Sequence, residues 1–366
     1  MTEPDITHQR LNNQHLEGRR PARPEDVVAW LGAIQAQDYA GAKWALGQRV
    51  QGADDAVVEQ AFTEGAILRT HVMRPTWHFV APADIRWLLA LTAPRVHAIN
   101  AYMYRQLELD DALCARSNQV MAEALAGGHY LTRAELGTVL ARAGIIAEGM
   151  RLGYIMHRAE LDAIVCSGPR RGKQFTYALL DERAPQAKTL SREEALAELT
   201  RRYFTGHGPA MVQDFAWWSG LTVADVKEGL EMVKDSLIRE TVGAQTFWLA
   251  PDMPLVKGPS PAIYLLPNYD EFLISYRDNR SAVDPKHVRL FTLGNVIFNH
   301  FVVLDGRVIG SWKRTFEKKT VVIVLRLFET VSKAQSRAIQ AAAERFGRFL
   351  GLPVTLVDDP LPTDLE

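Results

Sequence analysis

Hydrophobic and polar positions along this chain change from a helical period to a strand period, and they do so three times. A helical spacing over Pro24 to Ala33 and another near 57–62 precede two runs of strand character, Ile67 to Met73 and Thr76 to Val80. Proline at position 24 suits a first helical turn, and Arg74-Pro75 separates the two runs. The first segment is therefore predicted to be helices followed by a two-stranded ribbon.

Two later segments have the same order of elements. Capping-box patterns, Thr132 with Glu135 and Ser191 with Glu194, mark helix starts in them. The predicted helices cover 151–161, 214–219 and 222–233, and the predicted ribbons pair 163–166 with 175–180 and 237–242 with 246–249. Helices followed by a ribbon form the plan of the winged helix, a helix-turn-helix variant. The repeat is one of architecture, without residue-level periodicity.

The rest of the chain differs in kind. Residues 84–126 are predicted to be all helical, and the chain after Pro261 is rich in strand patterns. Expected strands cover 263–266, 272–276, 296–304, 307–312, 321–328 and 354–357, and a helix is expected over 335–350. Asp305-Gly306 is a hairpin signal, and Gly351 suits a helix end. The predicted fold class is α+β: winged-helix units over 1–83, 131–185 and 186–258, a helical connection over 84–130, and a C-terminal β-barrel-like domain over 259–366.

Composition excludes several classes of protein. The 366 residues are 47% hydrophobic and 23% charged, with a net charge of −1 and two cysteines. No apolar run approaches the roughly 20 residues that span a bilayer, and the N-terminus lacks the features of a secretory signal. No Cys or His cluster has metal-ligand spacing. We therefore expect a cytoplasmic, monomeric protein that needs no cofactor, metal or membrane.

Basic residues recur in short groups although the net charge is near zero. The groups are Arg19-Arg20 with Arg23, Arg170-Arg171 with Lys173, Arg201-Arg202, Arg277 with Arg280, Lys313-Arg314, and Lys318-Lys319. Any one of them is explained by a solvated loop. Together they could form a face that follows a phosphate backbone. We expect Arg170, Arg171, Lys173, Lys313, Arg314, Lys318 and Lys319 to contact DNA.

Gln35-Ala36-Gln37 is the stretch that carries the most chemical information. Glutamine is no proton base at neutral pH, but its amide can orient a water molecule through its donors and its acceptor. Such a pair suits hydrolysis of a bond that is already activated. Residues two apart share a face only in an extended backbone, so we expect the motif at a helix end or just beyond it. The alternative is that the amides only cap a helix.

These motifs together resemble the AlkZ-like winged-helix DNA glycosylases, bacterial enzymes that unhook alkylated DNA. The matching blocks, which span most of the chain, are 9–16, 31–38, 44–49, 68–70, 73–78, 265–272, 276–278 and 305–312. The family's catalytic motif is glutamine, an aliphatic residue, and then glutamine or aspartate. Gln35-Ala36-Gln37 is similar to the first branch, which includes self-resistance enzymes of bacteria that make DNA-alkylating antibiotics. One departure is Pro75, where the family pattern has glycine.

The resemblance implies a monofunctional glycosylase that acts on double-stranded DNA with N7-alkylated purines, crosslinked ones included. Such a base is cationic and departs as a neutral molecule without being protonated. The enzyme must then place a water molecule and stabilise an oxocarbenium-like sugar. Gln35 and Gln37 are expected to hold the water, and Asp38 to stabilise the sugar. A helix cap or an ion pair with Arg49 or Lys43 explains Asp38 equally well.

Several other residues have both a structural and a functional interpretation. His78 is a candidate DNA contact on the first ribbon, although a packed histidine is the simpler interpretation, as it is for His71. Trp217-Trp218 could stack on a base or fill a core, and Tyr269-Asp270-Glu271 could supply carboxylates or act as scaffold. Two other functions stay open at this point: a non-catalytic DNA-binding regulator and a drug-sequestering protein. Release of N7-methylguanine from DNA would distinguish them from a glycosylase.

Overall fold

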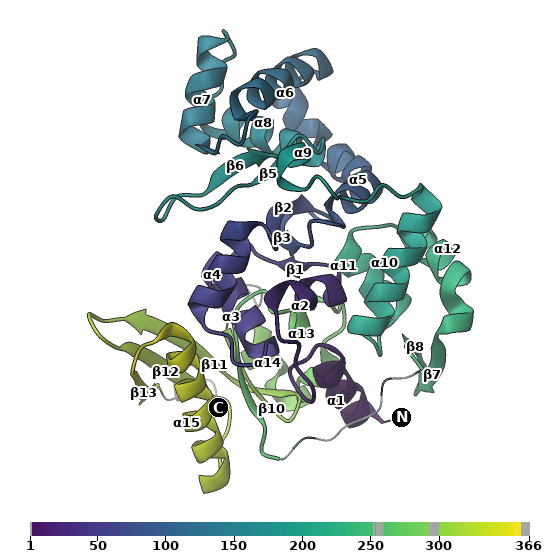
Figure 1. The fold of residues 1–366 in the computed structure, drawn as a ribbon. Helices are drawn as coiled ribbons and strands as arrows, with labels where there is room; N and C mark the ends of the chain where they lie inside the picture. The colour runs from purple at the N-terminus through teal and green to yellow at the C-terminus, as the bar shows by residue number, and fades with distance from the viewer. Residues whose placement is uncertain (1, 252, 254–257, 259, 293–299, 360–366) are drawn as a thin grey trace.

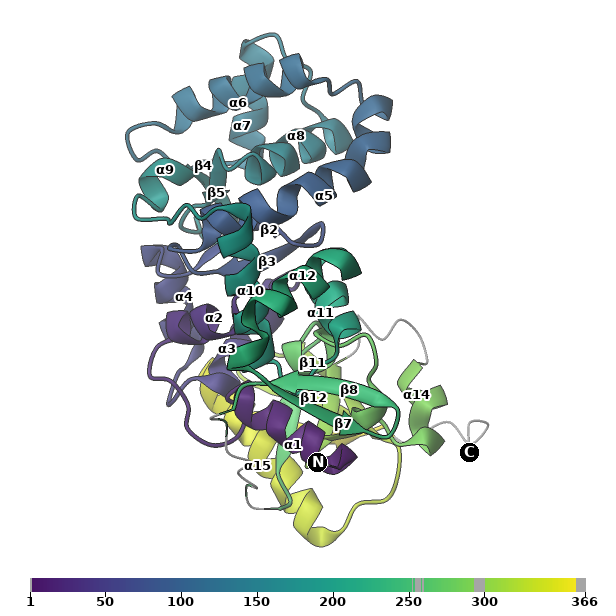
Figure 2. The same cartoon turned by 90° about the vertical axis from the view of Figure 1, so that its right-hand side faces the viewer.

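The computed structural model describes residues 2–251, 253, 258, 260–292 and 300–359 (Figure 1). It is a mixed α+β fold in which helices accompany four separate sheets. In both views, residues 107–180 lie at one end of the molecule and the C-terminal sheet at the other (Figures 1 and 2). Between them lie the first helices and ribbon together with the helices of residues 192–233.

The first segment contains helices followed by a ribbon, as its pattern predicts, and two further helices, over 3–13 and 39–49, that the pattern did not predict. After α1 (Glu3–Asn13), its elements are α2 (Pro24–Leu31), β1 (Ile34–Gln35), α3 (Tyr39–Arg49), α4 (Asp55–Glu64), β2 (Leu68–Val72) and β3 (Thr76–Val80). The short β1, which the sequence did not predict, pairs antiparallel with β3 and gives the sheet the order β1-β3-β2. The turn between β2 and β3 begins at Met73, whose φ is 61°.

The second segment has its own core at the far end of the molecule. Its elements are α5 (Ile85–Gln106), α6 (Asp111–Leu125), β4 (Leu131–Thr132), α7 (Arg133–Arg142), α8 (Gly149–Leu161), β5 (Val165–Ser167), β6 (Thr176–Leu179) and α9 (Leu180–Arg183). Thr132 and Glu135 form the predicted capping box. Helix α6 packs in the same core as α7 and α8. The helical stretch 84–130 is therefore more than a connection, because its second helix belongs to this core.

The third segment again places a ribbon after helices. It consists of α10 (Arg192–Gly206), α11 (Val212–Ser219), α12 (Val223–Val233), β7 (Ile238–Val242) and β8 (Gln245–Leu249). Ser191 and Glu194 form the second predicted capping box. These helices pack against α5 and the first ribbon in one hydrophobic cluster, which includes Val72, Leu88 and Trp218. The third segment is thus tied directly to the first.

The C-terminal region is an open five-stranded sheet. Its elements are β9 (Ile263–Leu266), α13 (Glu271–Ile274), α14 (Val288–Thr292), β10 (His300–Leu304), β11 (Arg307–Phe316), β12 (Val321–Leu327), α15 (Lys333–Leu350) and β13 (Val354–Asp358). The strand order is β13-β12-β11-β10-β9, and β13 joins β12 in parallel. No pairing between the described strands closes the sheet into the expected barrel.

The open sheet is explained by helices on both of its faces. Leu265 and Val302 pack toward α3 and α15, whereas their neighbours Leu266 and Phe301 share a cluster with Leu11 of α1. Alternating side chains of one strand thus enter two different cores. Because each face is already buried, closure is not needed to cover it.

The structure bears on three predictions for this region. The alternation of Phe272, Ile274 and Tyr276 predicted a strand over 272–276, which is wrong: residues 271–274 form α13. The Asp270 side chain caps this helix by accepting a hydrogen bond from the Phe272 N–H at 2.9 Å, and this local bond favours the helical turn. The strand expected over 296–304 is observed as β10, although 296–299 lie outside the described residues. Asp305 and Gly306, with φ of 48° and 81°, form the predicted hairpin turn.

A buried ion pair joins α3 to the start of α13. The Arg49 guanidinium donates to both carboxylate oxygens of Asp270, at 2.9 and 2.7 Å, and also to the Gln14 side-chain oxygen at 3.0 Å. The side chains of Arg49 and Asp270 are 1% and 0% exposed. Three distant parts of the sequence therefore meet at one fully desolvated charge pair.

Both cysteines, Cys114 and Cys166, are buried free thiols.

Candidate active site

The Gln35-Ala36-Gln37 motif lies just beyond a helix end, as its spacing predicts, with Gln35 in β1 and Gln37 in the bend before α3. Gly32, with φ of 81°, follows the last residue of α2, and β1 then runs antiparallel to β3 with Gln35 opposite His78. The Ala36 N–H donates to the Trp77 carbonyl at 2.7 Å. From the other side, Arg69 Nε donates to the Ala36 carbonyl at 3.0 Å. These bonds fix the centre of the motif.

The two glutamines have different surroundings. Gln35 is buried, and its Oε1 accepts a hydrogen bond from Arg74 Nη2 at 2.9 Å. Gln37 is exposed, and its Oε1 accepts from the Trp77 N–H at 3.3 Å. Within the described part of the chain, neither amide NH₂ group donates to another protein atom. Each glutamine therefore has its oxygen engaged and its NH₂ group open.

Glu271 binds the backbone of the motif at the Gln35 N–H. Its Oε1 accepts from the Gln35 N–H at 2.7 Å, and its Oε2 accepts from Trp218 Nε1 at 2.9 Å and from the Ser275 hydroxyl. Burial opposes the charge, but the nearby His207 imidazole and hydrogen bonds from the Ser275 hydroxyl and the Gln35 N–H outweigh it and lower the pKa of Glu271 to about 2. Glu271 is therefore a buried carboxylate at neutral pH.

Sequence reasoning missed Arg74 and underrated Glu271. The sequence places Arg74 only in a turn, and it leaves Tyr269-Asp270-Glu271 open between carboxylate chemistry and scaffold. The available signal is an acidic pair between the aromatic residues Tyr269 and Phe272, because a buried carboxylate needs donors. Nothing in the sequence indicated that its donors would come from Gln35 and Trp218, which are distant along the chain.

Of the two adjacent tryptophans, only Trp217 is exposed at this site. Trp218 is fully buried and belongs to the core, whereas Trp217 is 48% exposed. The Trp217 indole N–H donates to the Ile274 carbonyl at 3.1 Å, and the Arg74 guanidinium carbon lies 5.9 Å from the ring centroid. The core interpretation is therefore correct for one tryptophan and incorrect for the other.

His78 does not have the surface position that a DNA contact requires. It is 0% exposed, and its Nδ1 hydrogen bonds to the Thr76 carbonyl at 2.9 Å. Burial, and then the nearby Arg74 charge, lowers the pKa of His78 to about 3, so the ring is neutral at pH 7. The assignment of His78 to DNA binding is therefore wrong, because the ribbon places this histidine inside the protein.

The buried imidazole of His78 predicts a loss of stability in mild acid. In the unfolded chain its pKa returns to 6.5, so below this pH the unfolded state binds a proton that the folded state excludes. Stability should therefore fall as pH drops from 6.5 toward 4, by about 1.4 kcal/mol per pH unit for this group. Urea unfolding across this range should show a shallower slope for His78→Gln than for wild type. The exposed His129→Gln is the control, and equal slopes in all three proteins would contradict the prediction.

Asp38 caps α3 and is partly neutralised. Its Oδ1 accepts from the Gly41 N–H at 3.1 Å, and its Oδ2 lies 3.5 Å from Arg314 Nη2. The cap was one of the two structural interpretations and is confirmed. The expected ion-pair partners were wrong, because Arg49 binds Asp270 while Lys43 binds Asp55 and Glu59. The Asp38 side chain keeps 28% exposure, so it can still face solvent beside the motif.

The basic groups divide into paired and unpaired residues. Arg170 packs on Tyr39 and Phe175 and pairs with Glu59 at 3.4 Å, and Arg171 pairs with Glu135 at 2.7 Å. Arg314 is mostly buried on Phe346. In contrast, four exposed lysines have no carboxylate partner among the described residues: Lys173, Lys313, Lys318 and Lys319. The β5–β6 and β11–β12 hairpins that carry these residues project from the left side of the molecule in Figure 1.

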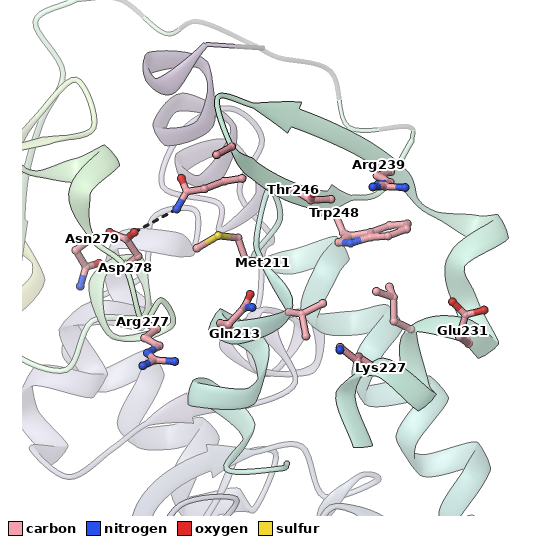
Figure 3. A pocket seen from close by; sticks show the side chains of 14 residues that line it. Met211, Gln213, Lys227, Glu231, Arg239, Thr246, Trp248, Arg277, Asp278 and Asn279 are labelled. Carbon is pink, nitrogen blue, oxygen red and sulfur yellow. Dashed lines mark hydrogen bonds between the residues drawn. The ribbon is translucent and has the colours of Figure 1, made fainter. Parts of the chain in front are cut away.

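A large groove of the described surface lies elsewhere. It has a volume of about 1080 Å³ between α11, α12, the β7–β8 ribbon and residues 277–279 (Figure 3). Apolar side chains such as Met211 and Trp248 line it, and its charged lining residues are Lys227, Glu231, Arg239, Arg277 and Asp278. It contains no residue of the glutamine motif. Its link to the motif is α11, where Gln213 lines the groove one turn before Trp217.

The residues that the structure describes lack two further features. No helix there is long and apolar enough to cross a membrane. The same residues contain no group of three or more His, Cys, Asp or Glu side chains that could hold a metal ion.

The chain is similar to known proteins over most of its length. The family described as DNA glycosylase AlkZ-like matches residues 28–349. A curated relative from Streptomyces sahachiroi, named interstrand DNA cross-link repair glycosylase, is 25% identical over 95% of this chain and 97% of its own length. The solved structure of Streptomyces sahachiroi DNA glycosylase AlkZ superposes with a TM-score of 0.82 and 23% identity, covering 98% of this chain and all of the other.

The family match includes β1, the first ribbon and α13, and so it contains the glutamine motif, Arg74 and Glu271. It also includes most of the C-terminal sheet and α15. The matched region covers far more than half of the 366 residues. The chain therefore belongs to the AlkZ-like DNA glycosylase family and is an enzyme of that class.

Proposed function

We propose that this enzyme hydrolyses the N-glycosidic bond of N7-alkylated, cationic purines in double-stranded DNA, including purines held in interstrand crosslinks. The observation that carries the proposal is the pair of open amide NH₂ groups on Gln35 and Gln37. Both lie in the short segment between α2 and α3, and only Ala36 separates them. A leaving base that already carries positive charge needs no acid, so an oriented water suffices. The relative named for crosslink repair supports the crosslinked substrate.

Water placement is the main task assigned to the motif. In the reaction, the C1′–N bond breaks with its electron pair going to the base, and a water oxygen bonds to C1′ and loses a proton to solvent. Gln35 and Gln37 would orient that water, while Asp38 would stabilise the cationic sugar. The Arg314 guanidinium, whose Nη2 lies 3.5 Å from Asp38 Oδ2, reduces the negative electrostatic potential of Asp38 without cancelling it. We therefore assign Asp38 the smaller contribution.

We further propose that the three helix–ribbon segments are winged helices that surround the DNA. Lys318 and Lys319 in the β11–β12 turn, with Lys313 on β11 and Lys173 in the β5–β6 hairpin, are the best placed to contact phosphates because they are exposed and unpaired. Arg171 is exposed but already paired, and Arg170 and Arg314 are held by internal contacts. We assign Arg170 and Arg314 to the support of the site.

Base release without strand cleavage is the expected outcome of the test. Duplex DNA that contains N7-methylguanine should lose the free base, and the abasic product should break only after alkali treatment. The reason is that Lys43, the lysine nearest to the motif in sequence, is held at 2.8 Å by each of Asp55 and Glu59 and cannot act as a nucleophile. Borohydride should therefore trap no covalent complex. A trapped complex would contradict the hydrolytic mechanism, and no base release would contradict the function itself.

The lysines of the β11–β12 turn should contribute to affinity and not to chemistry. Replacing both Lys318 and Lys319 with alanine should weaken DNA binding and reduce the slope of log affinity against log salt by about 2, roughly 0.9 for each lost phosphate contact. Lys333→Ala is the matched control, since Lys333 is an exposed lysine at the start of α15, away from the β11–β12 turn. Fluorescence anisotropy at several salt concentrations measures the slope. An unchanged slope in the double variant would remove this turn from the proposed interface.

A further inference from the structure

The orientation of the Gln35 amide is determined by its neighbours, and this restricts what Gln35 can do. Arg74 Nη2 donates to Gln35 Oε1 at 2.9 Å, and guanidinium has donors but no acceptor. Rotating the amide by half a turn would place its NH₂ group against the donors of a cation. The amide is therefore held with its oxygen toward Arg74 and its NH₂ group away from it.

Arg74 itself is fixed by α11 of the third segment. The C-terminal end of α11 packs on the β2–β3 turn so closely that a Cβ at Gly220 would lie 2.8 Å from the Met73 carbonyl oxygen and 3.5 Å from Arg74 Cγ. Trp217, on the same helix, lies beside the guanidinium at 5.9 Å. The donor to Gln35 is thus placed by a contact between the first and third segments.

The backbone of Gln35 is bound by a residue of the C-terminal region. Glu271 accepts the Gln35 N–H at 2.7 Å, and its other oxygen is bound by Trp218 at 2.9 Å. Glu271 is completely buried, and His207 Nε2 lies 3.7 Å from it. A single carboxylate therefore links β1, α11 and α13, and it also places a negative charge near the Arg74 cation.

We propose that Gln35 serves hydrolysis as a hydrogen-bond donor through its NH₂ group, and that Arg74 and Glu271 are positioning residues that impose this role. The inference rests on the proposed glycosylase function of the motif. Gln35 would donate to the oxygen of the attacking water. Gln37, whose Oε1 has only a 3.3 Å contact with the Trp77 N–H, would accept a hydrogen bond from that water.

Gln35→Glu is the decisive variant, because it keeps the shape of the side chain and the oxygen that faces Arg74 but removes the NH₂ donor. Single-turnover excision of N7-methylguanine should fall about as far as in Gln35→Ala, by roughly 10-fold to 1000-fold. Affinity for DNA should stay within about twofold, because the substitution is remote from the proposed phosphate contacts. Excision by Gln35→Glu at or above the wild-type rate would overturn the inference, since the oxygen would then be the working group.

The positioning role is tested by two conservative pairs of variants. Arg74→Met should lower the excision rate at saturating DNA by about 10-fold or more without changing the salt slope of binding, and Arg74→Lys should recover part of the rate. Glu271→Gln keeps an oxygen for the Gln35 N–H and should retain more activity than Glu271→Ala, with folding of both verified by circular dichroism. A change of salt slope in Arg74→Met would make Arg74 a DNA contact, and equal rates in Glu271→Gln and Glu271→Ala would remove Glu271 from the proposal. Failure of wild type to release the base would instead refute the proposed function.

Discussion

Replacing Gln37 with alanine is expected to slow base excision by roughly one to three orders of magnitude while leaving DNA affinity unchanged. Gln37 is exposed, and its side chain has one hydrogen bond to the described part of the chain, the 3.3 Å contact with the Trp77 N–H. Its loss therefore costs the fold little. Because glutamine carries no charge, affinity that depends on lysine contacts to phosphate should persist.

The companion variant Gln35→Ala should lose activity over the same range, but its interpretation needs a folding control. Truncating Gln35 leaves Arg74 Nη2 without its acceptor in a buried position. Single-turnover excision and DNA affinity should be measured in parallel with thermal unfolding for both variants. Wild-type excision rates in both would show that the motif is structural. Loss of binding together with activity would place the amides in the DNA interface.

Residual activity of the two variants should depend on the lesion. A cationic leaving group lowers the intrinsic barrier, so N7-methylguanine should still be released at a measurable rate. Unhooking of a crosslink also requires access to a base tied to both strands. Comparing the two substrates in the same variant therefore separates water placement from access.

Replacing Arg49 with leucine is expected to destabilise the protein by about 3–5 kcal/mol, because it leaves the Asp270 carboxylate buried and unpaired. The pair is bidentate, with contacts of 2.9 and 2.7 Å, and both side chains are almost completely excluded from solvent. Urea unfolding should show the loss as a lower midpoint. Arg23→Leu is the matched control, since its ion pair with Asp26 is exposed and should contribute little.

The double variant Arg49→Leu with Asp270→Leu distinguishes the two origins of this effect. If the loss comes from a stranded charge, removing both charges should recover a large part of the stability. If the double variant is less stable than Arg49→Leu, hydrogen bonds of Asp270 within the cap of α13 are the larger contribution. An unchanged midpoint in Arg49→Leu alone would show that another group compensates Asp270.

Much of the secondary structure was predictable because its signals are local. The capping boxes at Thr132 and Ser191 and the turn at Asp305-Gly306 each depend on residues within one helical turn or one hairpin. The position of Gln35-Ala36-Gln37 just beyond a helix end also followed from local spacing. The strand expected over 272–276 was wrong because two local signals competed there. The alternation of apolar residues favoured a strand, but the capping bond of Asp270 decided the conformation.

By itself, the sequence determined the α+β class, the three helix–ribbon segments, the glutamine motif and the family. Only the tertiary structure decided which side chains surround that motif. Arg74 and Glu271 reach Gln35 from separate segments, His78 turns into the core, and Arg314 pairs with Asp38. The physical reason is that burial and charge pairing depend on contacts between residues far apart in the chain. A pattern of neighbouring residues records the conformation of the backbone, whereas the partner of a buried polar group is fixed only when the cores close around it.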